Sequence, residues 1–167
     1  DCVWTRIDGS GKWVGAPSTA TYGIKVTMAG GDSPSAFLKV RGLSRFVTIR
    51  GVEVDGKWPT LATNGIGIDV NDHSVYAADH PGMWTEGIVI EENYVHDVEG
   101  EGLYVGPNWP QGGLPLRNIQ IRRNQIEDTG WDGINLKSSS GGDSEIHHNV
   151  VRRAGKSNDT DAAQHKG

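Results

Sequence analysis

The sequence predicts an all-β chain wound as a solenoid of short strands, and three observations support this. No stretch has the periodicity of an amphipathic helix. Glycine is abundant, at 24 of 167 residues, which indicates many tight turns because turns need backbone with positive φ. One short pattern also recurs along the chain. Short strands between turns fit either a sandwich of hairpins or a solenoid, and the recurring pattern separates the two.

The recurring pattern places an asparagine at the same point between apolar residues. Its three full copies, and a weaker one with valine at the asparagine position, are Ile88–Val95, Ile119–Ile126, Ser144–Val151 and Val47–Val54. Asn93, Asn124 and Asn149 are therefore 31 and 25 residues apart. In a solenoid, equivalent residues stack at the strand spacing of about 4.8 Å, and stacked amides form a hydrogen-bond ladder. A sandwich has no reason to repeat an asparagine, so the pattern predicts a solenoid with an asparagine ladder.

A further short strand is expected after each copy, following a glycine turn. These strands alternate apolar with polar residues, so each is expected to be buried on one side. They are predicted at Phe37–Val40, Ile66–Val70, Leu103–Val105 and Ile134–Lys137. None of them is long enough to be a helix.

Residues 37–167 resemble the pectate-lyase-like superfamily of right-handed parallel β-helices, in the pattern I-x-I-x-x-N-x-[VI] followed by G-[IL]-x-[VIL]. The resemblance implies a right-handed, single-stranded parallel β-helix with three strands per rung and about four to five rungs. The strands after the glycine turns would be the first in each rung, and the other two would flank the asparagine turn. The resemblance also implies a secreted, extracellular protein that acts on a polysaccharide, although many functions share this scaffold.

Two parts of the chain differ in how well they fit the repeat. Residues 1–36 fit it poorly and are expected to be an N-terminal opening segment or an incomplete rung, whereas residues 37–167 are expected to form the β-helix. The sequence stops at Gly167, within a loop that would lead to another first strand. A solenoid ended there would expose strand edges, which soluble proteins avoid. We therefore expect a fragment of a longer helix, or end-to-end stacking through the open rung.

The charge distribution narrows the possible partners. The net charge of −5 argues against non-specific binding of nucleic acid, and no apolar run approaches the roughly 18 residues that span a membrane. Residues 51–101 hold eleven acidic residues against one lysine, which would repel a bare polyuronate. This favours a neutral glycan, or Ca²⁺ held by carboxylates to neutralise the substrate. Asp69 and Asp72 are the candidate oxygen ligands.

Candidate site residues are those expected to face outward from the first strands of the rungs. Aligning these strands by the pattern gives two columns of outward residues, Gly67/Tyr104/Asn135 and Asp69/Gly106/Lys137. In the turn before each strand, the aligned residues are Asn64, Glu101 and Asp132. Outward side chains with flanking loops form a groove. In it, Tyr104 would stack on or hydrogen-bond a sugar, and Asn135 would position that sugar. Glu101 and Asp132 are expected about 5 Å apart on adjacent rungs.

Two reactions remain open for this groove. Lys137, followed by serine, resembles a pair in some β-helical polysaccharide lyases, where the lysine takes the proton next to a uronate carboxylate in a β-elimination. Asp132 resembles one of two aspartates in polygalacturonase-like glycosidases, but Trp131 stands in place of the other. Glu101 and Asp132 could still be the acid and base of a hydrolase. The catalytic candidates are thus Lys137, Asp132 and Glu101.

Tryptophans near the groove are candidate sugar-binding residues, because indole rings stack on sugar rings and also donate a hydrogen bond. The candidates are Trp84, Trp109 and Trp131, and packing of the loops is the other explanation for them. His96, His147 and His148 fall on or beside strands away from the groove and are expected at the surface.

The rival function belongs to another class. The chain would then be a non-catalytic structural or glycan-binding module of a surface adhesin, tailspike or filament. Such a module would bind a glycan without turnover, or not bind one, and would associate end to end.

Overall fold

A computed structural model describes residues 5–8, 23–27, 36–41, 44–60, 65–70, 82–106, 114–137 and 144–156. These residues form strands and turns, with no helix among them. The strands are β1 (Thr5–Asp8), β2 (Ile24–Thr27), β3 (Ala36–Val40), β4 (Val47–Arg50), β5 (Val52–Asp55), β6 (Ile66–Val70), β7 (Thr85–Glu86), β8 (Val89–Glu91), β9 (Tyr94–Val98), β10 (Leu103–Val105), β11 (Leu116–Arg117), β12 (Gln120–Arg122), β13 (Gln125–Thr129), β14 (Ile134–Leu136), β15 (Glu145–His147) and β16 (Val150–Arg152). In the described part of the chain, no helix has the length and apolar character to cross a membrane.

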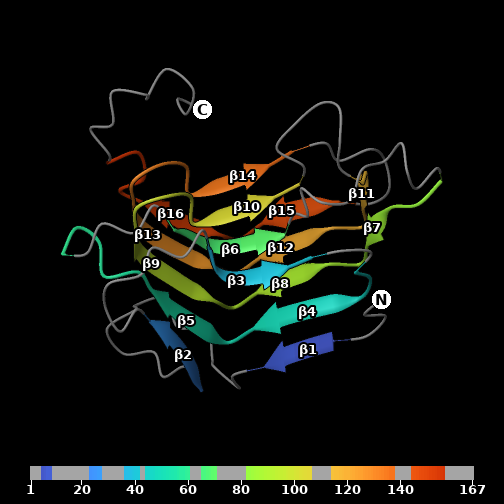
Figure 1. Cartoon of the computed structure of the whole chain (residues 1–167), viewed down its shortest axis with the longest axis horizontal. Coiled ribbons are helices and arrows are strands. Elements are labelled where there is room, and N and C mark those ends of the chain that lie inside the picture. Colours follow the sequence, from blue (N-terminus) through green and yellow to red (C-terminus); the bar gives the residue numbers. More distant parts are fainter. Residues whose placement is uncertain are drawn as a thin grey trace.

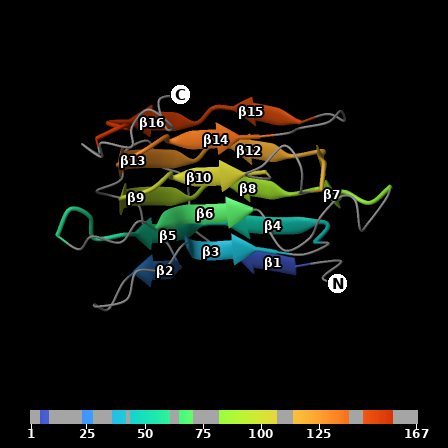
Figure 2. The same cartoon turned by 45° about the horizontal axis from the view of Figure 1, so that its top comes forward.

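The strands pair side by side in parallel sheets. Sheet A has the order β1-β4-β8-β12-β15, sheet B has the order β2-β5-β9-β13-β16, and sheet C has the order β3-β6-β10-β14. A small fourth sheet joins β7 to β11. The chain visits sheets A, B and C in the same order each time, and each visit adds the next strand to that sheet. Figures 1 and 2 show the resulting stack, from the blue β1 and β2 to the red β15 and β16.

The prediction of an all-β chain with parallel strands is confirmed. The four strands expected after the glycine turns coincide with β3, β6, β10 and β14 to within one residue at each end. Within residues 1–36, β1 pairs with β4 and β2 pairs with β5, so the described part of this segment extends sheets A and B. The division of the chain at residue 36 stays a prediction.

The core is built from apolar side chains that repeat at the same position of neighbouring strands. In sheet A, Ile49 pairs with Ile90, and Ile90 pairs with Ile121. All three are fully buried, as are Val54 and Val95 at adjacent positions of sheet B. Because side chains alternate between the two faces of a strand, burial of this set leaves the residues between them on the opposite face. Burying each such side chain stabilises the fold by about 1.5–3 kcal/mol.

The turn between sheets A and B is held by a column of asparagine side chains. Asn93 Nδ2 donates to Asn124 Oδ1, and Asn124 Nδ2 donates to Asn149 Oδ1, both at 3.0 Å. Each amide also donates to a backbone carbonyl one strand earlier in sheet A, as Asn124 does to Ile90 O at 2.8 Å. At the valine copy of the pattern, the Val52 N–H donates to Asn93 Oδ1. The amides therefore join successive turns and fix the register of the strands on either side.

Candidate functional site

The face of sheet C opposite the core presents a row of polar side chains. Register pairing sets Lys39 beside Asp69, Asp69 beside Tyr104, and Tyr104 beside Asn135. Lys39 Nζ lies 3.8 Å from Asp69 Oδ2. Because each of these residues comes from a different strand, the sheet brings together side chains that are far apart in the sequence.

The predicted columns on this face were partly wrong. Ile68, not Ile66, pairs with Leu103, so Asp69 lies beside Tyr104 and Gly67 lies level with Gly102. The physical reason is a stack of glycines, with Gly67 near the start of β6 and Gly102 and Gly133 directly before β10 and β14. A Cβ atom on Gly67 would lie 2.5 Å from Gly102 O, and one on Gly102 would lie 2.6 Å from Gly133 O. Only glycines fit such close backbone contacts, so they align with one another and shift β6 by two residues from the predicted register.

Tyr104 and Lys137, two of the predicted site residues, are in direct polar contact. Lys137 Nζ donates to Tyr104 Oη at 3.0 Å and lies 4.7 Å from the centre of the ring. Burial raises the pKa of the Tyr104 phenol, and the negative charges of Glu101 and Asp69 raise that pKa further. The phenol therefore keeps its proton at neutral pH, and its oxygen accepts a hydrogen bond from Lys137.

Glu101 and Asp132 lie at the start of adjacent strands of sheet C. The Gly67 N–H donates to Glu101 O, and the Gly102 N–H donates to Asp132 O, both at 2.9 Å. Asn135 Nδ2 donates to Asp132 Oδ2 at 3.2 Å. Glu101 is buried, whereas Asp132 is only half-buried. The structure thus brings the two predicted acids to neighbouring turns and joins Asp132 to the predicted positioning residue Asn135.

A pocket of about 580 Å³ lies beside β14, where sheet C ends. Three predicted site residues line it, Trp131, Asp132 and Asn135, together with the apolar side chains of Leu136 and Val151. An indole ring, a carboxylate and an amide around one hollow are the kinds of group that bind sugars.

Trp84 lies elsewhere, beside the small sheet of β7 and β11. The guanidinium of Arg117 lies 3.9 Å from the centre of its ring, and that of Arg45 lies 5.5 Å away. Its Nε1–H donates to Glu86 Oε2 at 3.0 Å. These cation–π contacts place Trp84 with the small sheet and not with the Tyr104 group. Trp109 and Asp72 lie outside the described residues, so the second tryptophan and the second calcium ligand stay predictions.

Sequence reasoning missed a second group, on the outer face of sheet B. Glu53 and Asp55 on β5 lie next to His96 on β9, with ligand atoms of all three within 4.8 Å of one another. Asp55 and His96 are register partners. The signal was present in the repeat, because Asp55 and His96 follow equivalent apolar residues in two successive copies.

Comparisons with known protein families, with characterised proteins and with solved structures found no match.

Proposed function

We propose that this chain is part of a secreted, right-handed parallel β-helix whose sheet C face binds an extracellular polysaccharide. The helix is supported by the fixed order in which the chain visits sheets A, B and C and by the stacked asparagine amides. The pectate-lyase-like resemblance of residues 37–167 supports the carbohydrate ligand. An indole, an amide and a carboxylate around the pocket beside β14 suit a sugar ring.

The reaction favoured by the sheet C face is β-elimination, and the contact between Lys137 Nζ and Tyr104 Oη carries this proposal. Lys137 Nζ would take the proton on the sugar carbon next to a uronate carboxylate. The electron pair of that C–H bond forms the new C=C bond, and the C–O bond to the leaving sugar breaks. The Tyr104 phenol would give its proton to the departing oxygen. Hydrolysis by Glu101 and Asp132 is the other reaction these residues could perform.

The experiment is a turnover assay on a panel of polysaccharides, reading the absorbance of unsaturated uronates and the formation of reducing ends. We expect unsaturated products, and a loss of at least about 100-fold in rate for Lys137→Ala. Lys156→Ala removes a lysine that donates to Asp128 of β13, away from the sheet C face, and should leave the rate unchanged. Reducing ends without unsaturated products would show that the reaction is hydrolysis and not elimination. No turnover of any glycan would contradict the enzyme proposal, and full turnover by Lys137→Ala would contradict elimination with Lys137 as the base.

One observation favours the non-catalytic alternative. Tyr104 and Glu101 are only 4% and 3% exposed, whereas a catalytic group must reach its substrate. A module that binds glycan without turnover would retain affinity for the same polysaccharide in a pull-down while giving no product.

End-to-end stacking is proposed on separate grounds. Among the described strands, β14, β15 and β16 are the last in sheets C, A and B, and Ile146 and Val151 on two of them are exposed. A second copy, or a further part of the same chain, would cover these apolar side chains and continue the parallel pairing. Because Val151 also lines the pocket beside β14, stacking at this end and sugar binding in that pocket are alternative uses of the same surface. Sedimentation that finds only compact monomers at high concentration would count against stacking of copies.

A further inference from the structure

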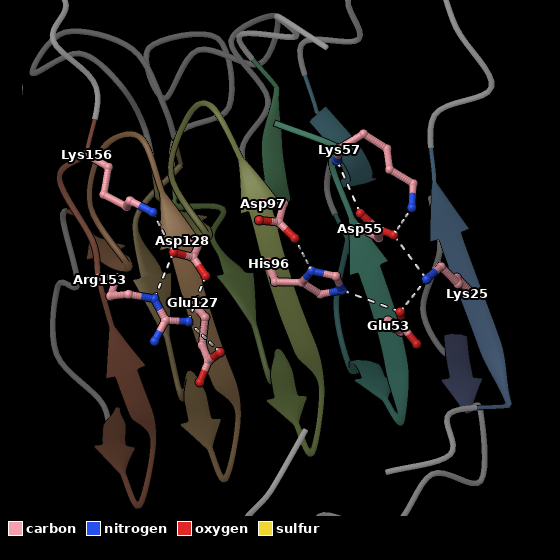
Figure 3. Close-up of polar contacts among 10 residues, drawn as sticks. All are labelled: Lys25, Glu53, Asp55, Lys57, His96, Asp97, Glu127, Asp128, Arg153 and Lys156. Carbon is pink, nitrogen blue, oxygen red and sulfur yellow. Dashed lines mark hydrogen bonds and ion pairs between the residues drawn. The ribbon is translucent and has the colours of Figure 1, made fainter. Parts of the chain in front are cut away.

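Two groups of charged residues lie on the outer face of sheet B. The histidine cluster consists of Lys25, Glu53, Asp55, Lys57, His96 and Asp97, and the arginine cluster consists of Glu127, Asp128, Arg152, Arg153 and Lys156. Figure 3 shows the first on β2, β5 and β9 and most of the second at the far end of the same sheet. They occupy equivalent positions, because Asp55 pairs with His96, His96 with Glu127, and Glu127 with Arg152.

The orientation of His96 is fixed from two sides. Its ring stacks on Tyr94, with centroids 4.2 Å apart and planes at 17°. Its Nδ1 lies 2.7 Å from Asp97 Oδ2. A carboxylate oxygen only accepts, so Nδ1 carries the proton of this hydrogen bond. In the neutral ring, the lone pair therefore lies on Nε2.

That lone pair faces a carboxylate. His96 Nε2 lies 3.4 Å from Glu53 Oε1, and two acceptors at this distance repel each other. A second proton on the ring or a cation between the two atoms would remove the repulsion. A histidine that donates Nδ1–H to a carboxylate while presenting Nε2 is the arrangement by which proteins orient a metal-binding imidazole.

The charge of the histidine cluster also favours a cation. It contains three carboxylates, Glu53, Asp55 and Asp97, against two ammonium groups, so its formal charge is −1 with the ring neutral. Lys25 Nζ lies 2.5 Å from Glu53 Oε1 and 3.0 Å from Asp55 Oδ2, and Lys57 Nζ also contacts Asp55 Oδ2. The two lysine side chains are 45% and 44% exposed, whereas Asp55 and His96 are 5% and 12% exposed. The ammonium groups can therefore move into water while the ligands stay in place.

We propose that Glu53, Asp55 and His96 form a binding site for a divalent transition metal, with Zn²⁺ as the best match. One imidazole nitrogen and two carboxylate oxygens are ligands that zinc accepts, and three protein ligands leave a fourth position for water. Asp97 is the residue that orients His96. Lys25 and Lys57 occupy the carboxylates when no metal is bound and compete with it. The site is separate from the sheet C face and does not depend on its function.

The arginine cluster provides the matched comparison within the same chain. At the equivalent positions, Arg153 donates to Asp128 at 2.8 and 2.7 Å and to Glu127 at 3.0 Å. Guanidinium stays protonated and offers no lone pair. Removing a carboxylate here should leave the metal affinity unchanged.

The test is isothermal titration calorimetry with zinc chloride at about pH 7.5, on the chain and on variants whose folding is checked by circular dichroism. We expect one site, weakened at least about 100-fold by His96→Ala and about 10- to 100-fold by Asp97→Asn, which keeps the shape of the side chain. Lys57→Ala should bind more tightly, because a competing ammonium is gone. Asp128→Asn should bind as the parent does.

His147 and His148 require a separate control, since their ring nitrogens lie 2.6 Å apart and imidazoles bind zinc. The His147→Ala/His148→Ala double variant should keep the affinity of the cluster. The proposal is overturned if the parent shows no zinc binding, if His96→Ala and Asp97→Asn bind as the parent does, or if the double variant abolishes binding.

Discussion

The histidine and arginine clusters occupy equivalent positions on one sheet but differ in charge and in chemistry. The histidine cluster has three carboxylates against two lysines, and the arginine cluster has two carboxylates against three basic groups. In the second, every acid is bonded to a cation that cannot lose its proton at ordinary pH. In the first, one ring nitrogen faces a carboxylate instead. Ion pairs thus cross the strands in both clusters, whereas only the histidine cluster carries a side chain whose neutral form offers a lone pair to a metal.

In each cluster, hydrogen bonds from basic side chains lower the pKa of an aspartate. The hydrogen bond from Arg153 has the largest effect on the pKa of Asp128 and lowers it. Burial opposes this effect, but the hydrogen bond from Lys156 lowers the pKa further, so that it lies well below its usual range. Burial raises the pKa of Asp55, but hydrogen bonds from Lys57 and Lys25 outweigh it, so that its pKa is lowered. The hydrogen bond to Glu53 raises the pKa of Lys25. Asp55 and Lys25 in the histidine cluster and Asp128 in the arginine cluster are therefore ionised at neutral pH.

The largest expected effect comes from breaking the register that both clusters share. Asn124 lies directly before β13, and its side chain accepts from the N–H and the amide of Asn93 while donating to Ile90 O and Asn149. Asn124→Ala leaves several buried groups without partners, at about 1–3 kcal/mol each. We expect a loss of about 3–5 kcal/mol in the free energy of unfolding, measured by urea denaturation.

Asn149→Ala is the matched control for that prediction, because Asn149 lies at the last turn of the column and is only half-buried. It should cost no more than about half as much. Equal losses for the two variants, or a loss below about 1 kcal/mol for Asn124→Ala, would mean that the asparagines do not hold the register.

A smaller effect is expected in how the stability contributed by the arginine cluster depends on pH. The lowered pKa of Asp128 contributes stability that is complete above its unfolded value of about 3.9 and is lost as the pH falls toward the folded value. Asp128→Asn removes this contribution. Between about pH 6 and pH 3 the parent should therefore lose more stability than the variant, by up to about 1 kcal/mol because the pair is near water. Urea unfolding at the two pH values measures the difference, and parallel losses would show that the Arg153 pair contributes nothing.

The strands and their order were predictable because the repeat is local and periodic. Apolar alternation marks each strand, and Asn93, Asn124 and Asn149 mark equivalent turns. The register of β6 could not be obtained in this way. A shift of two residues keeps every apolar side chain on the same face, so Ile66 and Ile68 fit opposite Leu103 equally well in the sequence. The observed register is the one in which the glycines stack, where a Cβ atom on Gly67 would meet both Gly102 O and the side chain of Val95.

The histidine cluster escaped prediction for a related reason. An outward position on a strand is compatible with water, so His96 alone carries no sign of a site. Its neighbour Glu53 lies 43 residues earlier, and the two meet only when β5 and β9 pair in one particular register. The pairing of Tyr104 with Lys137 depends likewise on the alignment of β10 with β14.

The central claim is that the histidine cluster has an unprotonated ring nitrogen, Nε2 of His96, whereas the arginine cluster has no nitrogen with a lone pair to offer. Nuclear magnetic resonance tests this claim most directly. A long-range ¹H–¹⁵N correlation spectrum at about pH 8, where an ordinary histidine is neutral, reports which ring nitrogen of His96 carries the proton. We predict a protonated Nδ1 and an unprotonated Nε2, with Nε2 as the nitrogen that shifts when Zn²⁺ is added. A protonated Nε2 that donates to Glu53, unchanged by Zn²⁺, would contradict the claim.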